Sequence, residues 1–141
     1  MTNPELTALI DSMDDDRVEL LLHHFAEVPL TIALPPRTGL LMLAVHDSFN
    51  TAFYPGEILV TEARVVHDGC EGFGMVLGEA PRKALARAAT DAVLQHPGDT
   101  PIGESIRAFL TEEAAMQKAA QAVHGAMLAA TKVNFDLMPG A

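Results

Sequence analysis

A histidine and the only cysteine of the chain lie three residues apart, at a spacing that suits nucleophilic chemistry. His67 and Cys70 flank Asp68-Gly69, a dipeptide typical of a two-residue hairpin turn, so the turn would bring the imidazole and the thiol close together. A cysteine nucleophile needs a base and an electropositive surrounding that favours the thiolate. The adjacent charges, Asp68 and Glu71, oppose a thiolate. The sequence therefore favours a structural Cys70, and we predict no catalytic residue in this chain.

Three glycines follow the cysteine and precede a predicted helix, as in a phosphate-binding loop. The spacing of Gly72, Gly74 and Gly78 misses the dinucleotide-binding pattern by one residue, and no Lys-Ser or Lys-Thr follows as in a P-loop. Glu79 stands where an anion would meet the helix N-terminus and would repel it. Two glycines on one face weaken a strand unless another backbone or a bulky group lies close above them. We therefore predict a strand with a tight turn and no bound cofactor.

Six histidines raise the question of a metal site. His23 and His24 are adjacent, so they face different sides of a helix and cannot easily share an ion. No two histidines stand four residues apart, and no carboxylate completes a familiar zinc pattern. The acidic runs Asp14–Asp16 and Glu112-Glu113 are typical of solvated charges at helix starts. The sequence predicts no metal site.

The charge of the chain is strongly acidic, with 19 Asp and Glu against 9 Lys and Arg and a formal net charge of −10. Nucleic-acid binding requires Lys and Arg that replace the counterions of phosphates, so we expect no nucleic-acid partner. The same field repels a free polyanion, so the positive groups for any phosphorylated compound would come from a partner protein.

The composition is that of an ordinary folded domain, with 141 residues of which 49% are hydrophobic and 20% charged. We expect one domain over residues 1–141. One cysteine excludes a disulfide within the chain. No run approaches the roughly 18 apolar residues of a membrane span, and the first residues do not resemble a signal peptide. The cytoplasm is the expected compartment.

Helical spacing predicts helices at both ends of the chain. The first segment opens at Asn3-Pro4, with Thr2 or Asn3 as the N-cap, and reaches about residue 26 as two short helices or one with a break at Asp14–Asp16. Two more helices are expected, from Pro81 to about Gln95 and from about Ile102 to Ala130. Thr111-Glu112-Glu113 could restart the last helix. The tail is not expected to be helical beyond about Asp136.

Four strand-like runs separated by turn signals occupy the middle of the chain: Pro29–Leu34, Gly39–His46, Glu57–His67 and Cys70–Leu77. The connections have hairpin length and leave no room for the crossovers of a parallel sheet. The fold class predicted is α+β, with a four-stranded antiparallel meander packed with the N-terminal helical segment and the two C-terminal helices.

The third run alternates, and one of its faces mixes charge with aliphatic surface. Glu62 and Arg64 fall on the same face as Ile58, Val60 and Val66. A mixed face on a small sheet suits an interface with another protein better than a substrate cleft.

Three stretches together resemble the PhnG family of bacterial phosphonate metabolism. They are Thr38-Gly39-Leu40-Leu41; the segment from Gly56-Glu57-Ile58-Leu59-Val60-Thr61 through Gly72, Gly74 and Gly78 to Ala84 and Thr90-Asp91-Ala92; and the tail Ala130-Thr131-Lys132-Val133-Asn134-Phe135-Asp136-Leu137-Met138. They span about the last 105 residues in the family's order. Within that pattern Arg37 replaces a Glu and Glu62 replaces an Arg. This acid–base swap would keep an ion pair between neighbouring strands.

Other departures concern polar residues. The family's Arg-Asp after the third glycine is Glu79-Ala80 here, and its Ala-Glu is Ala84-Leu85. Any phosphate contact that those family residues make is therefore not expected in this chain. The scaffold is kept better than the polar positions, as in a diverged paralogue.

The resemblance implies a cytoplasmic accessory subunit of the PhnG–PhnH–PhnI–PhnJ core complex of carbon–phosphorus lyase, packed on PhnI and without a recognised catalytic residue. In that pathway, PhnI with PhnG, PhnH and PhnL displaces adenine from ATP with a phosphonate, giving a ribose 1-phosphonate 5-triphosphate. The isolated subunit is expected to expose a sizeable apolar patch or to self-associate, for example as a homodimer. The alternatives are a diverged interaction module outside phosphonate metabolism and an independent enzyme that uses Cys70 and His67.

Overall fold

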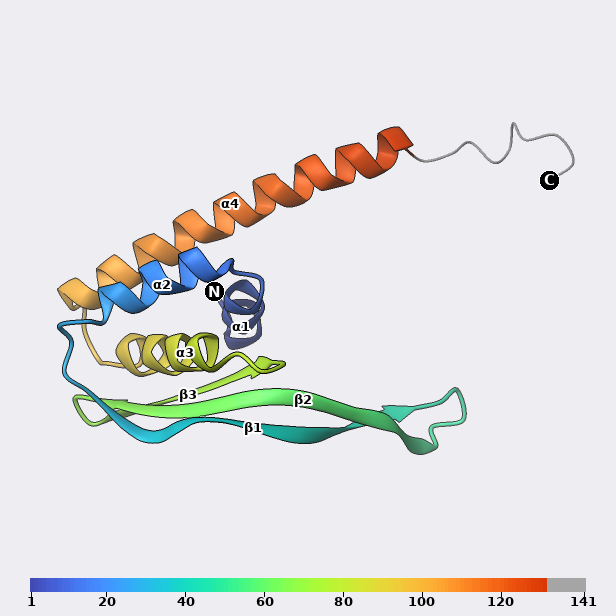
Figure 1. Ribbon diagram of the computed structural model, residues 1–141, viewed down its shortest axis with the longest axis horizontal. Coiled ribbons are helices and arrows are strands. Elements are labelled where there is room, and N and C mark those ends of the chain that lie inside the picture. Colours follow the sequence, from blue (N-terminus) through green and yellow to red (C-terminus); the bar gives the residue numbers. More distant parts are fainter. Residues whose placement is uncertain (132–141) are drawn as a thin grey trace, which may run out of the picture.

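The computed structural model describes residues 1–131 and shows a three-stranded sheet covered on one face by helices (Figure 1). The elements in chain order are α1 (Asn3–Asp11), α2 (Asp15–His24), β1 (Leu30–His46), β2 (Ala52–His67), β3 (Cys70–Leu77), α3 (Pro81–Leu94) and α4 (Pro101–Thr131). Helix α3 lies directly on the sheet, and α2 and α4 lie on the far side of α3. Helix α1 lies beside the end of α3 and also contacts β3. The α+β class is confirmed.

The sheet has three antiparallel strands in the order β1-β2-β3, so the prediction of four strands is wrong. The two runs expected as separate strands, Pro29–Leu34 and Gly39–His46, form one strand that continues through Pro35-Pro36. The register shifts on either side of these prolines, between Ile32 and Leu34 and between Leu34 and Arg37. Proline is tolerated here because β1 is an edge strand, where a bulge can absorb residues without an N–H donor.

The turns between the strands follow local backbone chemistry. Asp68 and Gly69 have φ of 48° and 80°, which confirms the predicted hairpin turn between β2 and β3. The turn between β1 and β2 is held by Asp47, whose carboxylate accepts the backbone N–H of Phe49 and of Thr51 at 2.9 Å each.

The N-terminal segment consists of two helices, and its break lies at the acidic run as predicted. Thr2 caps α1 in a capping box with Glu5, which receives the backbone N–H of Thr2 at 2.6 Å. Helix α2 begins at Asp15, and Asp14 is its N-cap. Helix α4 runs without a restart at Thr111, whose hydroxyl donates to the carbonyl of Arg107 at 2.9 Å within the helix.

Two apolar clusters hold the helices to each other and to the sheet. The larger joins α1, α2, α3 and the first part of α4 around fully buried Ile10, Leu21 and Ile106. The smaller joins β2, β3 and α3 through Ala63, Val65, Val76, Ala84 and Ala88. The absence of tryptophan and the low aromatic content leave these cores aliphatic.

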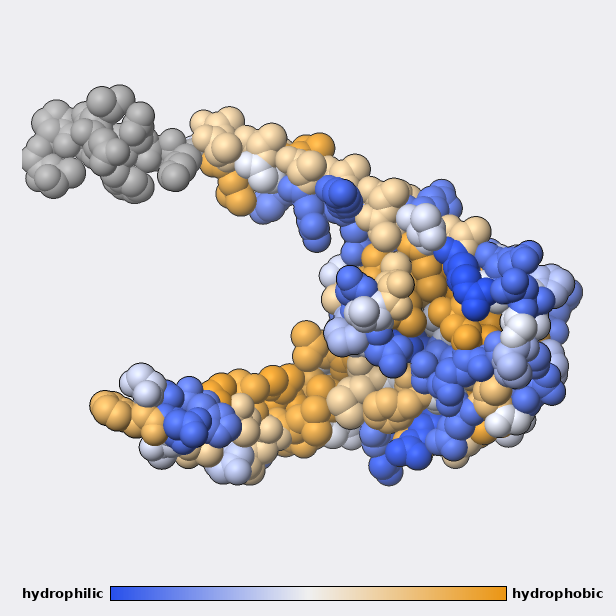
Figure 2. Space-filling model, turned by 180° about the vertical axis from the view of Figure 1, so that it is seen from behind, coloured by the Kyte–Doolittle hydropathy of each residue, from blue (hydrophilic) through white to orange (hydrophobic). Residues whose placement is uncertain are grey.

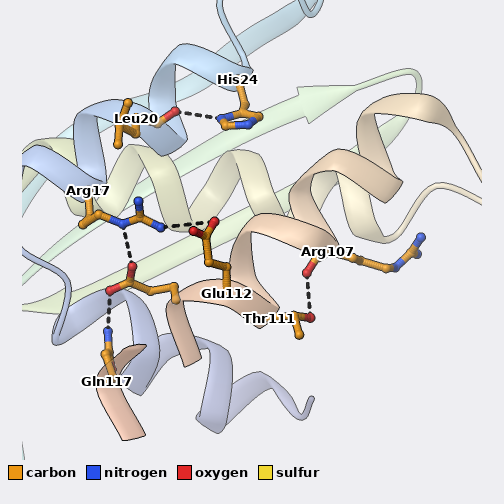
Figure 3. A network of polar contacts seen from close by, with 8 residues as sticks. Arg17, Leu20, His24, Arg107, Thr111, Glu112 and Gln117 are labelled. Atoms are coloured by element: carbon orange, nitrogen blue, oxygen red, sulfur yellow. Dashed lines mark hydrogen bonds and ion pairs between the residues drawn. The ribbon is translucent and has the colours of Figure 1, made fainter. Parts of the chain in front are cut away.

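A buried ion pair ties α2 to α4 (Figure 3). Arg17 donates to Glu113 at 2.7 Å, and Glu113 is 4% exposed. Gln117 donates from one amide nitrogen to Glu113 at 3.1 Å and to the carbonyl of Leu9 at 2.9 Å, which adds α1 to the network. The preceding residue, Glu112, is exposed and lies 3.8 Å from Arg17. The expectation of solvated charge therefore holds for Glu112 and is wrong for Glu113.

Candidate functional surface

The His67–Cys70 pair is brought together by the hairpin but is not arranged as a nucleophile and its base. The two residues are direct neighbours across β2 and β3. The buried His67 ring lies 3.4 Å from the carbonyl oxygen of Pro29 and 6.0 Å from the ring of His96. His96 is paired with Asp68 at 2.5 Å. Within residues 1–131, no hydrogen bond joins the thiol of Cys70 to His67, and the imidazole contacts belong to the packing of the turn.

The glycines of β3 serve the close approach of α3 to the sheet. A Cβ atom on Gly72 would lie 2.1 Å from the carbonyl oxygen of Ala88 and 2.3 Å from the nitrogen of Ala92, and one on Gly74 would lie 2.3 Å from the carbonyl oxygen of Ala84. The expectation of a backbone close above these glycines is therefore confirmed. The alanines of α3 and the glycines of β3 together allow the helix backbone to pack close to the strand.

The N-terminus of α3 is occupied by groups of the chain itself. The hydroxyl of Thr61, which is buried, donates to the carbonyl of Gly78 at 2.6 Å and accepts the N–H of Ala80 at 3.0 Å. Lys83 donates to the carbonyl of Asp11 at 2.8 Å. The turn that resembled a phosphate loop is thus a clamp that fixes the start of the helix.

The cations of the first turns of α3 are also paired. Arg82 forms a two-point ion pair with Glu19, with its second nitrogen at 2.7 Å, and this hydrogen bond lowers the pKa of that carboxyl. Arg87 is 5% exposed, donates to the hydroxyl of Thr7 at 3.0 Å and lies 3.8 Å from Asp91. Burial lowers the pKa of the Arg87 guanidinium. Both arginines join α3 to a neighbouring helix, and neither is left unpaired.

Of the two adjacent histidines, His24 is held by contacts within the body. The ring of His24 lies 2.8 Å from the carbonyl oxygen of Leu20 and packs edge-on against Phe109 at 5.2 Å (Figure 3). In the part of the chain that the structure describes, no three His, Cys, Asp or Glu side chains are grouped so that they could hold a metal ion.

The charged residues of the mixed face are paired within the sheet. Arg37 and Glu62 are direct cross-strand neighbours and form an ion pair of 2.7 Å, so the expected pair between neighbouring strands is confirmed. Arg64 lies 3.2 Å from Glu71, with its guanidinium 5.5 Å from the centre of the Phe73 ring. These polar groups are satisfied, and the residues beside them on the face are apolar.

An apolar pocket of about 390 Å³ lies between α2, β1, β2 and α3. Aliphatic and aromatic residues line it, among them Phe25, Leu30 and Leu85. Its one charged lining residue is Arg82, which is paired with Glu19. The pocket therefore offers no free acid, base or nucleophile.

The most unusual surface is a projecting β-hairpin, the ribbon arm (residues 38–59), which extends beyond the helices (Figure 1). From position 37 to position 57 every residue is exposed except Val45, which is half-buried. Leu40 and Met42 are 61% exposed, and Leu41 and Leu43 are 44% and 40% exposed. Apolar side chains of this size are normally buried, so the arm presents a surface suited to another protein.

Both faces of the ribbon arm are apolar. Leu40 pairs with Leu59, on the face that carries α3 further along the sheet. Leu41 pairs with Ile58 on the opposite face. Strands with apolar residues on both faces are typical of sheets that are covered on both sides.

A second projection, the helix arm (residues 116–131), is the distal half of α4. Every residue from Lys118 to Thr131 is exposed. The helix persists beyond its contacts because six of these residues are alanines, the best helix formers. Its exposed large apolar residues are Met116, Val123, Met127 and Leu128.

The two arms border a wide, open cleft, and apolar side chains gather along both (Figure 2). Charge is scarce on them: the ribbon arm carries Asp47 and Glu57, and the helix arm carries Lys118. The acidic side chains lie mainly on the body of the molecule. The arms are therefore sparsely charged apolar surfaces attached to an acidic body.

The family resemblance predicts an exposed apolar patch without giving its position in the chain. The signal is the near-continuous apolar run Gly39–His46, which the sequence predicts as a strand. A long apolar strand signals burial without saying which chain supplies the cover. The mixed face of Glu62 and Arg64, which the sequence predicts to suit a protein interface, adjoins the exposed apolar residues of the ribbon arm.

A chain with paired polar groups and two large uncovered apolar arms has the form of an assembly subunit. The sequence model of a family described as "Phosphonate metabolism protein PhnG" matches residues 4–140. The chain belongs to the PhnG family, and the resemblance seen in its sequence is confirmed. No curated protein matches the sequence at a significant level. The tail Ala130–Met138 falls within the family match. The prediction that the tail is not helical beyond about Asp136 concerns residues 132–141, which lie outside the described residues.

None of the helices described is long and apolar enough to cross a membrane.

Proposed function

We propose that this chain is a non-catalytic, accessory subunit of the carbon–phosphorus lyase system, in the cytoplasm. Its partners would be a PhnI-type subunit and, within the same core complex, PhnH and PhnJ. The complex would displace adenine from ATP with a phosphonate and form a ribose 1-phosphonate 5-triphosphate. The chain would support that reaction by binding and positioning the PhnI-type subunit.

The observation that carries the proposal is the pair of uncovered apolar arms. A chain that acted alone in water would gain by replacing exposed leucines and methionines with polar residues. The ribbon arm instead presents Leu40, Leu41, Met42 and Leu43 in one uncharged run. Membership of the PhnG family supports a role in phosphonate metabolism. The exposed apolar arms support the expectation that the chain binds a partner protein in that pathway.

Growth on a phosphonate tests the proposal in cells. We expect deletion of the gene to abolish growth on methylphosphonate as the only phosphorus source and to leave growth on phosphate unchanged. A plasmid copy of the gene should restore growth. Unimpaired growth of the deletion strain on methylphosphonate, with the other core genes intact, would show that the chain has no part in the pathway.

A diverged interaction module outside phosphonate metabolism is the alternative, favoured by the departures Glu79-Ala80 and Leu85 from the family pattern. Neighbouring genes that encode the other core subunits would support the subunit role, and unrelated neighbours would support the alternative.

An independent enzyme using Cys70 is a third possibility, and a single substitution tests it. Because the thiol has no hydrogen bond to His67 among the described residues, we expect Cys70→Ala to restore full growth of the deletion strain. Loss of growth by a Cys70→Ala protein of unchanged stability would assign chemistry to the thiol.

A further inference from the structure

The ribbon arm leaves backbone hydrogen-bonding groups unpaired along its edges. Strand β3 pairs with β2 only from Val60 to His67, so the arm itself consists of two strands. Over residues 38–46 the outer edge of β1 has no neighbouring strand in the sheet of the described chain. A two-stranded hairpin is marginally stable in water, and open edges readily pair with another strand.

The two edges of the arm differ in how they are protected. The outer edge of β2 carries Pro55 and Glu57, residues of the kind that block strand addition. The edge of β1 from Gly39 to Val45 carries neither proline nor charge. The β1 edge is therefore the one open to a further strand.

We propose that an extended segment of a partner chain adds to the outer edge of β1 as a fourth strand over Gly39–Val45. The added segment is uncharged and apolar, because it lies beside Leu40, Leu41, Met42 and Leu43 and shares with them two apolar faces. Main-chain hydrogen bonds to β1 align it, and its side chains extend the apolar surface on both faces of the arm.

The net charge of the chain favours a different protein, and not a second copy of this chain, as the molecule that pairs with the β1 edge. Each copy carries a formal net charge of −10, so self-pairing would bring two strongly acidic molecules together. The inference rests on the proposed function, since the segment is assigned to the PhnI-type subunit. It goes beyond that function in naming the edge, the residues and the backbone conformation of the contact.

Amide hydrogen exchange resolved to single residues tests the inference on the full chain, alone and bound to the PhnI-type subunit. In an antiparallel pair, amides along β1 alternate between those bonded to β2 and those directed to the free edge. We expect alternate amides of Gly39–Val45 to exchange rapidly in the isolated chain. In the complex these amides should be protected at least tenfold more strongly.

Adjacent proline substitutions separate backbone pairing from side-chain contact. Because Leu41 and Met42 are neighbours, one directs its N–H to β2 and the other to the free edge. The position at which proline leaves the stability unchanged is the one whose N–H points to the free edge. At that position, proline should weaken binding of the PhnI-type subunit at least tenfold more than alanine does. If neither proline is tolerated, the exchange measurement decides by itself.

Each outcome has a separate meaning. A complex that forms while the outward amides stay unprotected, or that tolerates the edge proline, overturns strand addition and leaves the subunit role intact. Failure of the unaltered chain to bind the PhnI-type subunit overturns the proposed function. Protection of both amide sets in the isolated chain, with the mass of a dimer in light scattering, identifies a second copy as the occupant and overturns the assignment to a partner.

Discussion

Residues that looked chemical in the sequence have structural roles in the folded chain. Gly72 and Gly74 make room for the backbone of α3, and Thr61 clamps the turn where an anion could otherwise bind. His67 contacts the carbonyl of Pro29 in the packing of a turn. These residues therefore stabilise the folded body, and the candidate functional features are the exposed surfaces of the chain.

The glycines of β3 allow a direct test of this packing. Gly72→Ala should lower the free energy of unfolding by about 3 kcal/mol, because its Cβ would meet the carbonyl oxygen of Ala88 at 2.1 Å and force helix and strand apart. Gly39→Ala is the matched control, since nothing lies within 4 Å of its Cβ position, and should change stability by about 0.5 kcal/mol or less. Urea unfolding followed by circular dichroism measures both. Equal effects of the two substitutions would contradict the role of Gly72.

The adjacent acids of α4 differ in burial and offer a second test. Glu113→Ala should lower the free energy of unfolding by about 3 kcal/mol, because it leaves the largely buried Arg17 without its 2.7 Å partner. Glu112→Ala, at a side chain 65% exposed and 3.8 Å from Arg17, should cost about 0.5 kcal/mol or less. The same urea titration compares them. A Glu113→Ala protein as stable as Glu112→Ala would show that the ion pair does not join α2 to α4.

At the scale of elements, the sequence predicted best where a local rule decides the outcome. The cap at Thr2, the Asp68-Gly69 turn and the start of α3 at Pro81 follow from residue types within one turn of chain. The division of β1 was wrong because the effect of Pro35-Pro36 depends on whether the strand lies at an edge. That position is a property of the whole sheet and is not visible in a local pattern.

The arms show the same limit for the functional surface. The apolar residues of Gly39–Val45 predict a buried strand. The sequence does not indicate whether the residues that bury it belong to this chain or to a partner. The ion pair of Arg37 and Glu62 was predicted because the family resemblance placed the two residues on neighbouring strands. The partner surface could not be found in this way, since no single residue marks it.

The helix arm should contribute to partner binding without contributing to folding. Val123→Glu places a charge on an apolar, 62% exposed position and should weaken binding to the PhnI-type subunit at least tenfold, because the carboxylate would be buried without a partner. Ser105→Glu, at an exposed position in the half of α4 that lies on the body, is the matched control and should bind normally. Titration calorimetry measures both affinities. Equal affinities would remove the helix arm from the interface.

At the scale of the whole molecule, the described residues form an acidic body with two sparsely charged apolar arms around an open cleft. This distribution separates two tasks. The body folds through its own aliphatic clusters. The arms lie outside these clusters, and in the proposed assembly their apolar surface would be buried against the partner. Arg82 and Arg87 of α3 are paired within the chain, which fits the proposal that a partner would supply the positive groups for a phosphorylated compound.

The most direct test of this account is to co-express the chain with the tagged PhnI-type subunit of the same source and to analyse the eluate by size-exclusion chromatography with light scattering. We expect both chains to elute together as one assembly of fixed stoichiometry that survives the column. The isolated chain should instead bind a dye that detects exposed apolar surface. A folded, monodisperse chain that elutes apart from the PhnI-type subunit would contradict the central claim and would mean that the PhnG scaffold serves a different partner.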